Sequence, residues 1–225
     1  MKKNYILTTI LIILTSLTYG QIVINEVDAD QTGTDTEEFI ELLWTPNTSL
    51  NGYVVVLFNG SDDKSYMSYD LDGKTTDADG LFILATSSIA TGSDIDMGTD
   101  NKVQNGADAV AVYLGDSTDF PNNTVISTTD LIDVLVYGIS DNDDSGLLTG
   151  FGLSIQYDED VNGKKDTESI QRKSDGTYEV KSPSKRVLSV LRDRIIGFAT
   201  YPNPVSDGVL NISSASTSVK NLTIF

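Results

Sequence analysis

The stretch INEVDADQTGTDTEEFIEL, residues 24–42, decides the fold class. Three apolar residues at 22–24 form a short strand that runs into Asn-Glu, and an acidic loop that contains a glycine follows. A second strand comes next, in which apolar residues surround Glu41. Two short strands joined by a carboxylate-rich loop are typical of a sheet, not of a helix bundle or a nucleotide-binding βαβ unit.

Short apolar strands separated by turn residues continue to about residue 180. Asn-Gly or Asp-Gly pairs, which are strong turn signals, stand beside several of them. No segment in this span has a sustained helical period, and no internal repeat is evident. The pattern predicts an antiparallel β-sandwich, although the spacing by itself also fits a jelly roll or a barrel. The later strands are predicted at residues 53–58, 81–85, 109–114, 131–137, 169–172 and 177–180.

Six blocks of this sequence resemble, in order, the lamin-tail domain of nuclear lamins and of many secreted bacterial proteins. The opening INEVD…EFIEL is followed by SLNGYVVVLFNGSDD (49–63), DADGLFILA (77–85), QNGADAVAVYLGD (104–116), LIDVLVYG (131–138) and ESIQRKSDGTY (168–178). The resemblance covers residues 21–184 and implies an all-β, immunoglobulin-like antiparallel sandwich that is not an enzyme. The chain has Ser-Pro-Ser at 182–184, where the family often closes with a Thr-Pro-Gly-type turn.

Residues 1–20 have the features of a secretory signal peptide. Lys2 and Lys3 form a positive start, and an uncharged apolar run follows at 5–17. This run is shorter than the about 20 residues that a membrane span needs. Gly20 is a small residue before a predicted cleavage ahead of Gln21. No later segment is apolar for long enough to span a bilayer, so we expect the mature chain to be secreted, extracellular or on the outer cell surface.

The composition excludes several classes of function. Without Lys2 and Lys3 the chain has 13 Lys and Arg against 33 Asp and Glu, a net charge of −20, which repels nucleic acid and anionic lipid. Cysteine and histidine are both absent, so no disulfide holds the fold. The same absence excludes a Ser-His-Asp triad, a cysteine nucleophile and a His/Cys zinc site. The sequence predicts a protein without catalytic activity.

The segment 199–225 is similar to the start of the C-terminal sorting domain of the bacterial type IX secretion machinery. The motif Tyr201-Pro202-Asn203-Pro204 carries the likeness, together with a strand expected at about 209–212. Such domains usually continue for several more strands, so we expect a truncated copy. The resemblance implies the secretion machinery as a partner. Residues 185–198 are expected to be a linker, although their interleaved basic and apolar side chains also fit a membrane-facing or partner-facing stretch.

The best candidate for a metal site is the acidic loop that begins at Asp158. Oxygen ligands at alternate positions, with a glycine at the sixth, are typical of a calcium loop. The glutamate falls one position early for an EF-hand, and no flanking helices are evident, so a solvated acidic turn is the alternative. Calcium is the only cofactor that the pattern suggests, and its predicted ligands are Asp158, Asp160, Asn162, Asp166 and Glu168.

The first acidic loop is a second candidate, and its carboxylates are Asp28, Asp30, Asp35, Glu37 and Glu38. The family-motif residues Asn25, Glu26 and Glu41 are expected to be structural, with Asn25 bonding the backbone in a turn and the glutamates accepting exposed N–H groups. Paired carboxylates also support glycoside hydrolysis in other proteins, but acids are too plentiful here for proximity to be informative.

Four aromatic residues suggest either a sugar-binding platform or ordinary core packing: Trp44, Tyr53, Tyr66 and Tyr69. Three functions follow from the sequence. The first is a secreted module for binding or adhesion, whose partner is an unknown extracellular protein or glycan. The second is an accessory part of an extracellular nuclease or phosphoesterase system, because the similar lamin-tail modules often sit beside such domains. The third is a calcium-dependent glycan-binding module.

Overall fold

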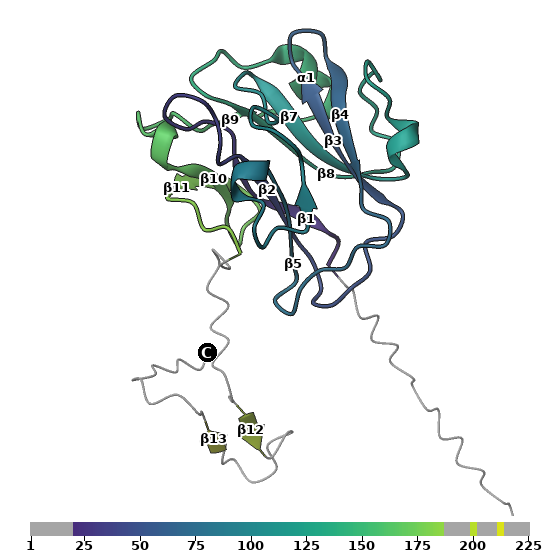
Figure 1. Ribbon diagram of the computed structural model, residues 1–225, viewed down its shortest axis with the longest axis vertical. Coiled ribbons are helices and arrows are strands. Elements are labelled where there is room, and N and C mark those ends of the chain that lie inside the picture. The colour runs from purple at the N-terminus through teal and green to yellow at the C-terminus, as the bar shows by residue number, and fades with distance from the viewer. Residues whose placement is uncertain (1–19, 187–198, 202–210, 214–225) are drawn as a thin grey trace, which may run out of the picture.

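Two β-sheets form the body of the protein in the computed structural model, which describes residues 20–186, 199–201 and 211–213 (Figure 1). The six-stranded sheet has the order β11-β10-β1-β2-β5-β6. Its strands are β1 Val23–Asp28, β2 Phe39–Leu43, β5 Leu81–Ala85, β6 Ile95–Asp96, β10 Ser169–Arg172 and β11 Tyr178–Lys181. The five-stranded sheet has the order β4-β3-β7-β8-β9. Its strands are β3 Tyr53–Asn59, β4 Lys64–Asp70, β7 Asp108–Leu114, β8 Leu131–Gly138 and β9 Tyr157–Asp158.

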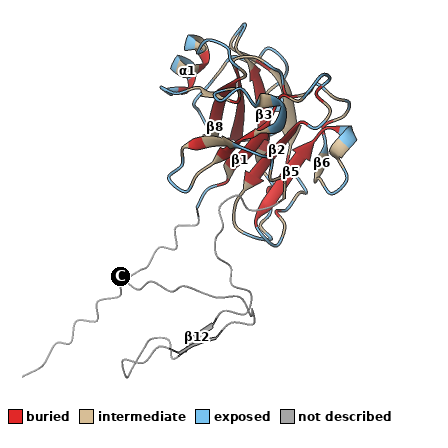
Figure 2. Cartoon of the chain, turned by 90° about the vertical axis from the view of Figure 1, so that its left-hand side faces the viewer, coloured by how far each residue is buried: buried red, intermediate tan, exposed pale blue. Residues whose placement is uncertain are grey.

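The two sheets share one hydrophobic core. Ile24 and Leu42 of the six-stranded sheet and Val55, Val110 and Leu135 of the five-stranded sheet belong to the same buried cluster. Figure 2 shows buried residues along the strands, with exposed residues in the loops and turns around them. A core built from both inner faces is what holds a β-sandwich together. The prediction of an all-β sandwich is therefore confirmed.

The sheets are mixed, so the expectation of purely antiparallel pairing was wrong at two edges. β6 pairs parallel to β5, and β9 pairs parallel to β8. Both of these edge strands are only two residues long. Each is reached by a connection that crosses over through a short helix, which is the kind of connection that parallel pairing requires.

A helix, α1 Ser145–Phe151, packs on the outer face of the five-stranded sheet, where no helix was predicted (Figure 1). The Asp144 carboxylate accepts the Leu147 N–H at its start, and Gly152 ends it in the left-handed conformation. The Phe151 ring meets the Phe58 ring edge-on, with centroids 5.3 Å apart. Seven residues are two turns, which is too short for a helical period to stand out in the sequence. The described residues also include three 3-10 helices, Ser87–Ile89, Ser117–Asp119 and Lys165–Thr167.

Strand β1 runs four residues beyond the predicted apolar strand and carries the first acids of the motif inside the sheet. Its register with β2 shifts between Ile24 and Glu26, which marks a β-bulge. After the bulge, Val27 belongs to the core cluster. Because side chains alternate along a strand, Glu26 and Asp28 lie on the opposite, outer face of the sheet.

The ends of the chain lie largely outside the described residues. The predicted signal peptide falls there except for Gly20, whose carbonyl accepts the Trp44 indole N–H. Next to it, the Gln21 side chain donates to the Ile132 carbonyl at 2.8 Å. β12 Ala199–Tyr201 pairs antiparallel with β13 Asn211–Ser213, so Tyr201 of the predicted sorting motif ends a strand. Pro202, Asn203 and Pro204 are not among the described residues. In the described part of the chain, no helix has the length and apolarity to cross a membrane.

Candidate functional site

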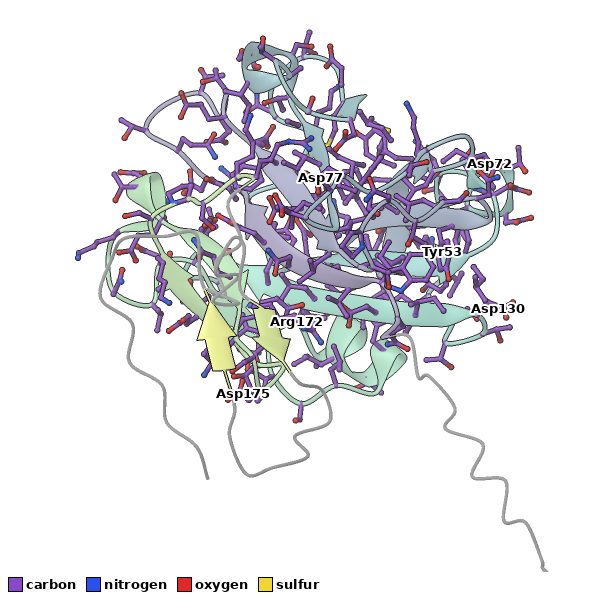
Figure 3. All side chains as sticks on the ribbon, turned by 90° about the horizontal axis from the view of Figure 1, so that it is seen from below. Tyr53, Asp72, Asp77, Asp130, Arg172 and Asp175 are labelled. Atoms are coloured by element: carbon purple, nitrogen blue, oxygen red, sulfur yellow. The ribbon has the colours of Figure 1, made fainter. Side chains whose placement is uncertain are left out.

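A pocket of about 240 Å³ opens between β8 and the β10–β11 hairpin. A charged pair lies in its lining: Arg172 Nη1 donates to Asp133 Oδ2 at 3.0 Å and to the Tyr178 hydroxyl at 2.7 Å. The Arg172 guanidinium also lies over the Tyr178 ring, 5.3 Å from its centroid. Burial raises the pKa of Asp133, and the positive charge of Arg172 partly offsets this rise. Figure 3 labels Arg172 within this region of the molecule.

The other walls of the pocket are aromatic and apolar. The Tyr157 ring meets the Tyr178 ring edge-on, with centroids 5.0 Å apart. Leu153 and Ile155 also line the pocket, and they expose 36 % and 52 % of their surface. Aromatic faces, an exposed apolar rim and a few fixed polar groups are the usual composition of a binding pocket. None of these residues belonged to the predicted site, because no local pattern joins residues 133, 157, 172 and 178.

A second, polar pocket of about 330 Å³ lies at the turn between β3 and β4. Asn59, Gln104 and Asn105 line it together with the carboxylates of Asp108 and Asp144. Asp108 is buried, and its Oδ1 accepts the Gly60 N–H at 2.9 Å. Burial and the nearby carboxylates raise the pKa of Asp108 to about 6. Its side chains are polar, acidic or small, and no aromatic ring lines it.

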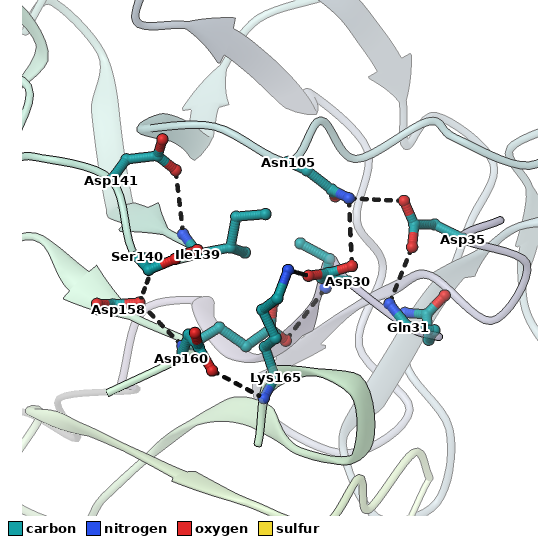
Figure 4. Close-up of polar contacts among 12 residues, drawn as sticks. Asp30, Gln31, Asp35, Asn105, Ile139, Ser140, Asp141, Asp158, Asp160 and Lys165 are labelled. Atoms are coloured by element: carbon teal, nitrogen blue, oxygen red, sulfur yellow. Dashed lines mark hydrogen bonds and ion pairs between the residues drawn. The ribbon is translucent and has the colours of Figure 1, made fainter. Parts of the chain in front are cut away.

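The first acidic loop is folded tightly by its own side chains. Gln31 donates from its side chain to Asp28 Oδ1 at 2.5 Å and from its backbone to Asp35 Oδ1 at 2.9 Å. Asn105 Nδ2 donates to Asp35 Oδ2 at 2.7 Å and to Asp30 Oδ1 at 3.3 Å (Figure 4). Asp28, Asp30 and Asp35 are all buried as a result. Glu38 accepts the backbone N–H groups of residues 102 and 103, whereas Glu37 is exposed.

The predicted calcium loop is closed by hydrogen bonds within the chain. Asp158 Oδ1 accepts the N–H groups of Ser140 and Asp160, both within 2.8 Å. Asn162 donates to Glu168 at 2.6 Å, and Asp166 lies in the short helix that follows. Among the residues that the structure describes, these carboxylates are not drawn together at one point. Calcium binding by this set of ligands remains a prediction.

The structure brings the two acidic loops together through residues that the sequence pattern did not select. Lys165 forms an ion pair with Asp30, as Figure 4 shows. Glu159 Oε1 accepts the Ala29 N–H at 3.3 Å. Burial, reinforced by the Asp28 carboxylate, raises the pKa of Glu159 to about 10, and burial raises the pKa of Asp28 to about 8. Glu159 lies between the predicted ligands Asp158 and Asp160. The sequence shows that it is acidic, but it does not show the contact with Ala29.

One group of three carboxylates in the described part of the chain has oxygens within 4.8 Å of one another: Asp70, Asp72 and Asp116. Asp72 and Asp116 are exposed, and Figure 3 shows Asp72 at the edge of the molecule. Asp70 accepts the N–H groups of Asp72 at 2.8 Å and of Ser117 at 3.2 Å. Its backbone contacts hold the pKa of Asp70 below its usual range. The arrangement is that of a solvated loop stabilised by backbone hydrogen bonds.

Glu26 and Glu41 have the structural role that the sequence predicts. Glu26 and Glu41 are buried on the outer face of the six-stranded sheet, beneath residues 182–186, which we call the strap. Glu26 accepts the Ser184 N–H at 2.7 Å, and Glu41 accepts the Arg186 N–H at 2.6 Å. Asn25 differs from the expectation: its side chain donates to Glu41 at 2.6 Å instead of bonding the backbone. The β-bulge turns Asn25 toward the neighbouring strand.

The strap also contacts the far edge of the sheet. Arg186 forms ion pairs with Asp77 at 2.8 Å and with Asp94 at 2.7 Å, and Lys185 Nζ donates to the Ile89 carbonyl at 2.7 Å. Lys185 and Arg186, which were predicted to begin the linker, therefore contact the sandwich directly.

The four aromatic candidates for a sugar platform pack against the main core. Trp44 meets Tyr53 edge-on, with ring centroids 5.4 Å apart. The Tyr66 hydroxyl donates to the Lys102 carbonyl at 3.1 Å and accepts the Gln104 N–H at 3.2 Å. Tyr69 is also only partly exposed. These contacts favour the packing interpretation over the platform.

Comparisons with protein-family models, with curated proteins and with solved structures find no match to this chain.

Proposed function

We propose that this chain is a secreted, non-catalytic binding module whose sandwich is of the immunoglobulin-like, lamin-tail type. Its partner is an extracellular protein or glycan at the bacterial cell surface. The observation that supports this proposal best is the pocket between β8 and the β10–β11 hairpin, where aromatic rings, an exposed apolar rim and the Arg172–Asp133 pair meet. Rings that stack on sugar or peptide groups and a guanidinium that donates hydrogen bonds are what such recognition uses.

Two observations support binding without catalysis. The sequence contains no histidine and no cysteine. In the pocket, the Asp133 carboxylate is already paired with Arg172, which also holds the Tyr178 hydroxyl. A general base or nucleophile needs an activated group that faces the substrate. The Asp133 carboxylate is instead paired with the Arg172 guanidinium, so it is not an activated base or nucleophile.

The proposed export route rests on the sequence. The signal-peptide features of residues 1–20 and the likeness of residues 199–225 to a sorting segment suggest the secretion machinery as a partner. The net charge of −20 opposes direct binding of nucleic acid. No specific contact among the described residues favours the accessory role in a nuclease system.

The experiment is a binding assay of the fluorescently labelled protein on a bacterial polysaccharide array and on intact cells. The test variants are Ile155→Ser and Tyr157→Ala, which change the pocket. The matched control is Val125→Ser, because Val125 is equally apolar and 66 % exposed but does not line the pocket. We expect binding to fall at least tenfold in both pocket variants and to be unchanged in the control. Equal binding by all three, or turnover of DNA or phosphoesters by the wild-type protein, would contradict the proposal.

A second candidate function, a calcium-dependent binding module, is favoured by one specific observation. A carboxylate oxygen of Glu159 is buried and has no hydrogen-bond partner.

A further inference from the structure

Glu159 holds a buried oxygen that nothing in the described structure satisfies. Its side chain is 0 % exposed, and its Oε1 accepts the Ala29 N–H at 3.3 Å. Its Oε2 has no hydrogen-bond partner. Burying a polar group without a partner costs free energy, and native proteins leave few such groups. The unpartnered oxygen of Glu159 is therefore a candidate ligand for a bound cation.

The surroundings of Glu159 supply further carboxylate oxygens, and the Lys165 ammonium contacts one of these carboxylates. The Asp28 and Asp30 carboxylates act on Glu159 electrostatically, and both are buried. Asp28 Oδ1 accepts from Gln31, which leaves Asp28 Oδ2 available. Lys165 lies on Asp30, and 32 % of its side chain is exposed, compared with 6 % for Asp30. A flexible ammonium with a path to solvent is able to leave Asp30 when a stronger cation arrives.

We propose that Glu159, Asp28 and Asp30 bind a divalent cation, by preference calcium, which replaces the Lys165 ammonium and joins the loop after β1 to the loop after β9. Carboxylate oxygens are hard ligands, and calcium tolerates the irregular coordination that two loops provide better than magnesium does. The inference deepens the calcium-dependent candidate function, but it does not depend on which ligand the pocket between β8 and the hairpin takes.

Calcium binding must bring the carboxylate oxygens of Glu159, Asp28 and Asp30 closer together. With Lys165 on Asp30, the three carboxylates do not all have oxygens within 4.8 Å of one another, as those of Asp70, Asp72 and Asp116 do. A bound cation is expected to draw the three oxygens together while Lys165 turns toward solvent. The exposed group at Asp72 has no unpartnered buried oxygen, and it provides the control.

The experiment measures calcium binding by the purified protein with isothermal titration calorimetry and with the melting temperature, using magnesium for comparison. We expect a Kd on the order of 10⁻⁴–10⁻³ M, the range of extracellular modules. At about a hundred times this Kd, Tm is expected to rise by about 5 °C or more. Glu159→Gln keeps the shape of the side chain but cannot form a carboxylate when a cation binds, and it should weaken binding at least tenfold. Asp72→Asn should bind as the wild type does.

Lys165→Met supplies a second, independent variant, because it removes the competing ammonium. If the cation replaces Lys165, the affinity for calcium rises several-fold in this variant. If the Lys165–Asp30 pair is only structural, Tm falls and the affinity does not rise, which overturns the inference. Absence of calcium binding by the wild type, or its loss in Asp72→Asn alone, overturns it as well. Ile155→Ser in the pocket must keep the calcium response, so failure of the pocket proposal is distinguishable from failure of this one.

Discussion

Glu26 and Glu41 are cross-strand partners on β1 and β2, and their two carboxylates hold the strap that leaves the sandwich after β11. Glu26 accepts the N–H of Ser184, and Glu41 accepts the N–H of Arg186. The strap thereby crosses the outer face of the six-stranded sheet. Two acids that would repel each other in an open sheet are instead each committed to donors from the strap and from neighbouring strands.

We expect Glu26→Ala to lower the free energy of unfolding by about 3 kcal/mol. The buried carboxylate accepts from Ser169 and Gln171 as well as from Ser184, and truncation removes one acceptor from each of these three donors. Urea denaturation followed by Trp44 fluorescence measures the change. Glu179→Ala is the control, because Glu179 is an acid on the edge strand β11 whose side chain is 40 % exposed, and its effect should stay within about 0.5 kcal/mol. Equal losses in both variants would contradict the role of Glu26.

The pH dependence of stability is expected to carry a contribution from Glu41. Burial raises the pKa of Glu41 from 4.5 to about 7 in the folded protein. The folded state therefore binds a proton more tightly than the unfolded state does. The resulting stabilisation is fully present below pH 4.5 and is lost as the pH rises through 7, and its size is on the order of 3 kcal/mol.

Glu41→Gln tests this contribution, because glutamine does not titrate. Unfolding free energies measured between about pH 5 and 8 should fall less steeply in the variant than in the wild type. Glu38 also has a pKa raised to about 7 by burial, so the slope is expected to decrease without vanishing. An unchanged slope would show that Glu41 does not titrate in this window.

Asp144→Ala is expected to destabilise the protein by about 1 kcal/mol, because its carboxylate caps α1 by accepting the Leu147 N–H at 2.7 Å. The adjacent Asp143 is exposed, and Asp143→Ala provides a control with the same change in charge. Thermal unfolding of the two variants side by side measures the difference. Equal melting temperatures for the two variants would show that the cap does not stabilise the protein.

Arg172→Met should cost about 2 kcal/mol, because it leaves the largely buried Asp133 carboxylate without its counter-charge. The double variant Arg172→Met with Asp133→Asn should recover part of this loss, since it no longer buries an unpaired charge. Chemical denaturation of the two single variants and the double variant forms a double-mutant cycle. A coupling energy near zero would mean that the pair contributes nothing to the fold around the pocket.

Much of the β-sandwich was predictable because strand signals are local. The predicted strand at 81–85 coincides with β5, and the one at 169–172 coincides with β10. Strand β4 and the two-residue edge strands β6 and β9 escaped prediction. Strands of two residues are too short to show an alternation of apolar and polar side chains. They form because the backbone of the adjacent strand provides hydrogen-bond partners. Helix α1 escaped for the same reason, although Asp144 and Gly152 stand at its ends as cap signals.

The sequence predicted only part of the candidate sites. Two acidic loops stood out, but the contact that joins them, from Ala29 to Glu159, spans 130 positions. The pocket at Arg172 likewise combines residues from β8, β9 and the β10–β11 hairpin. Composition and alternation determined the class of fold, its independence from disulfides and its negative charge, since each follows from the residues alone. Only the tertiary structure decided which carboxylates are buried together, because that depends on how the two sheets pack and which loops meet at their ends.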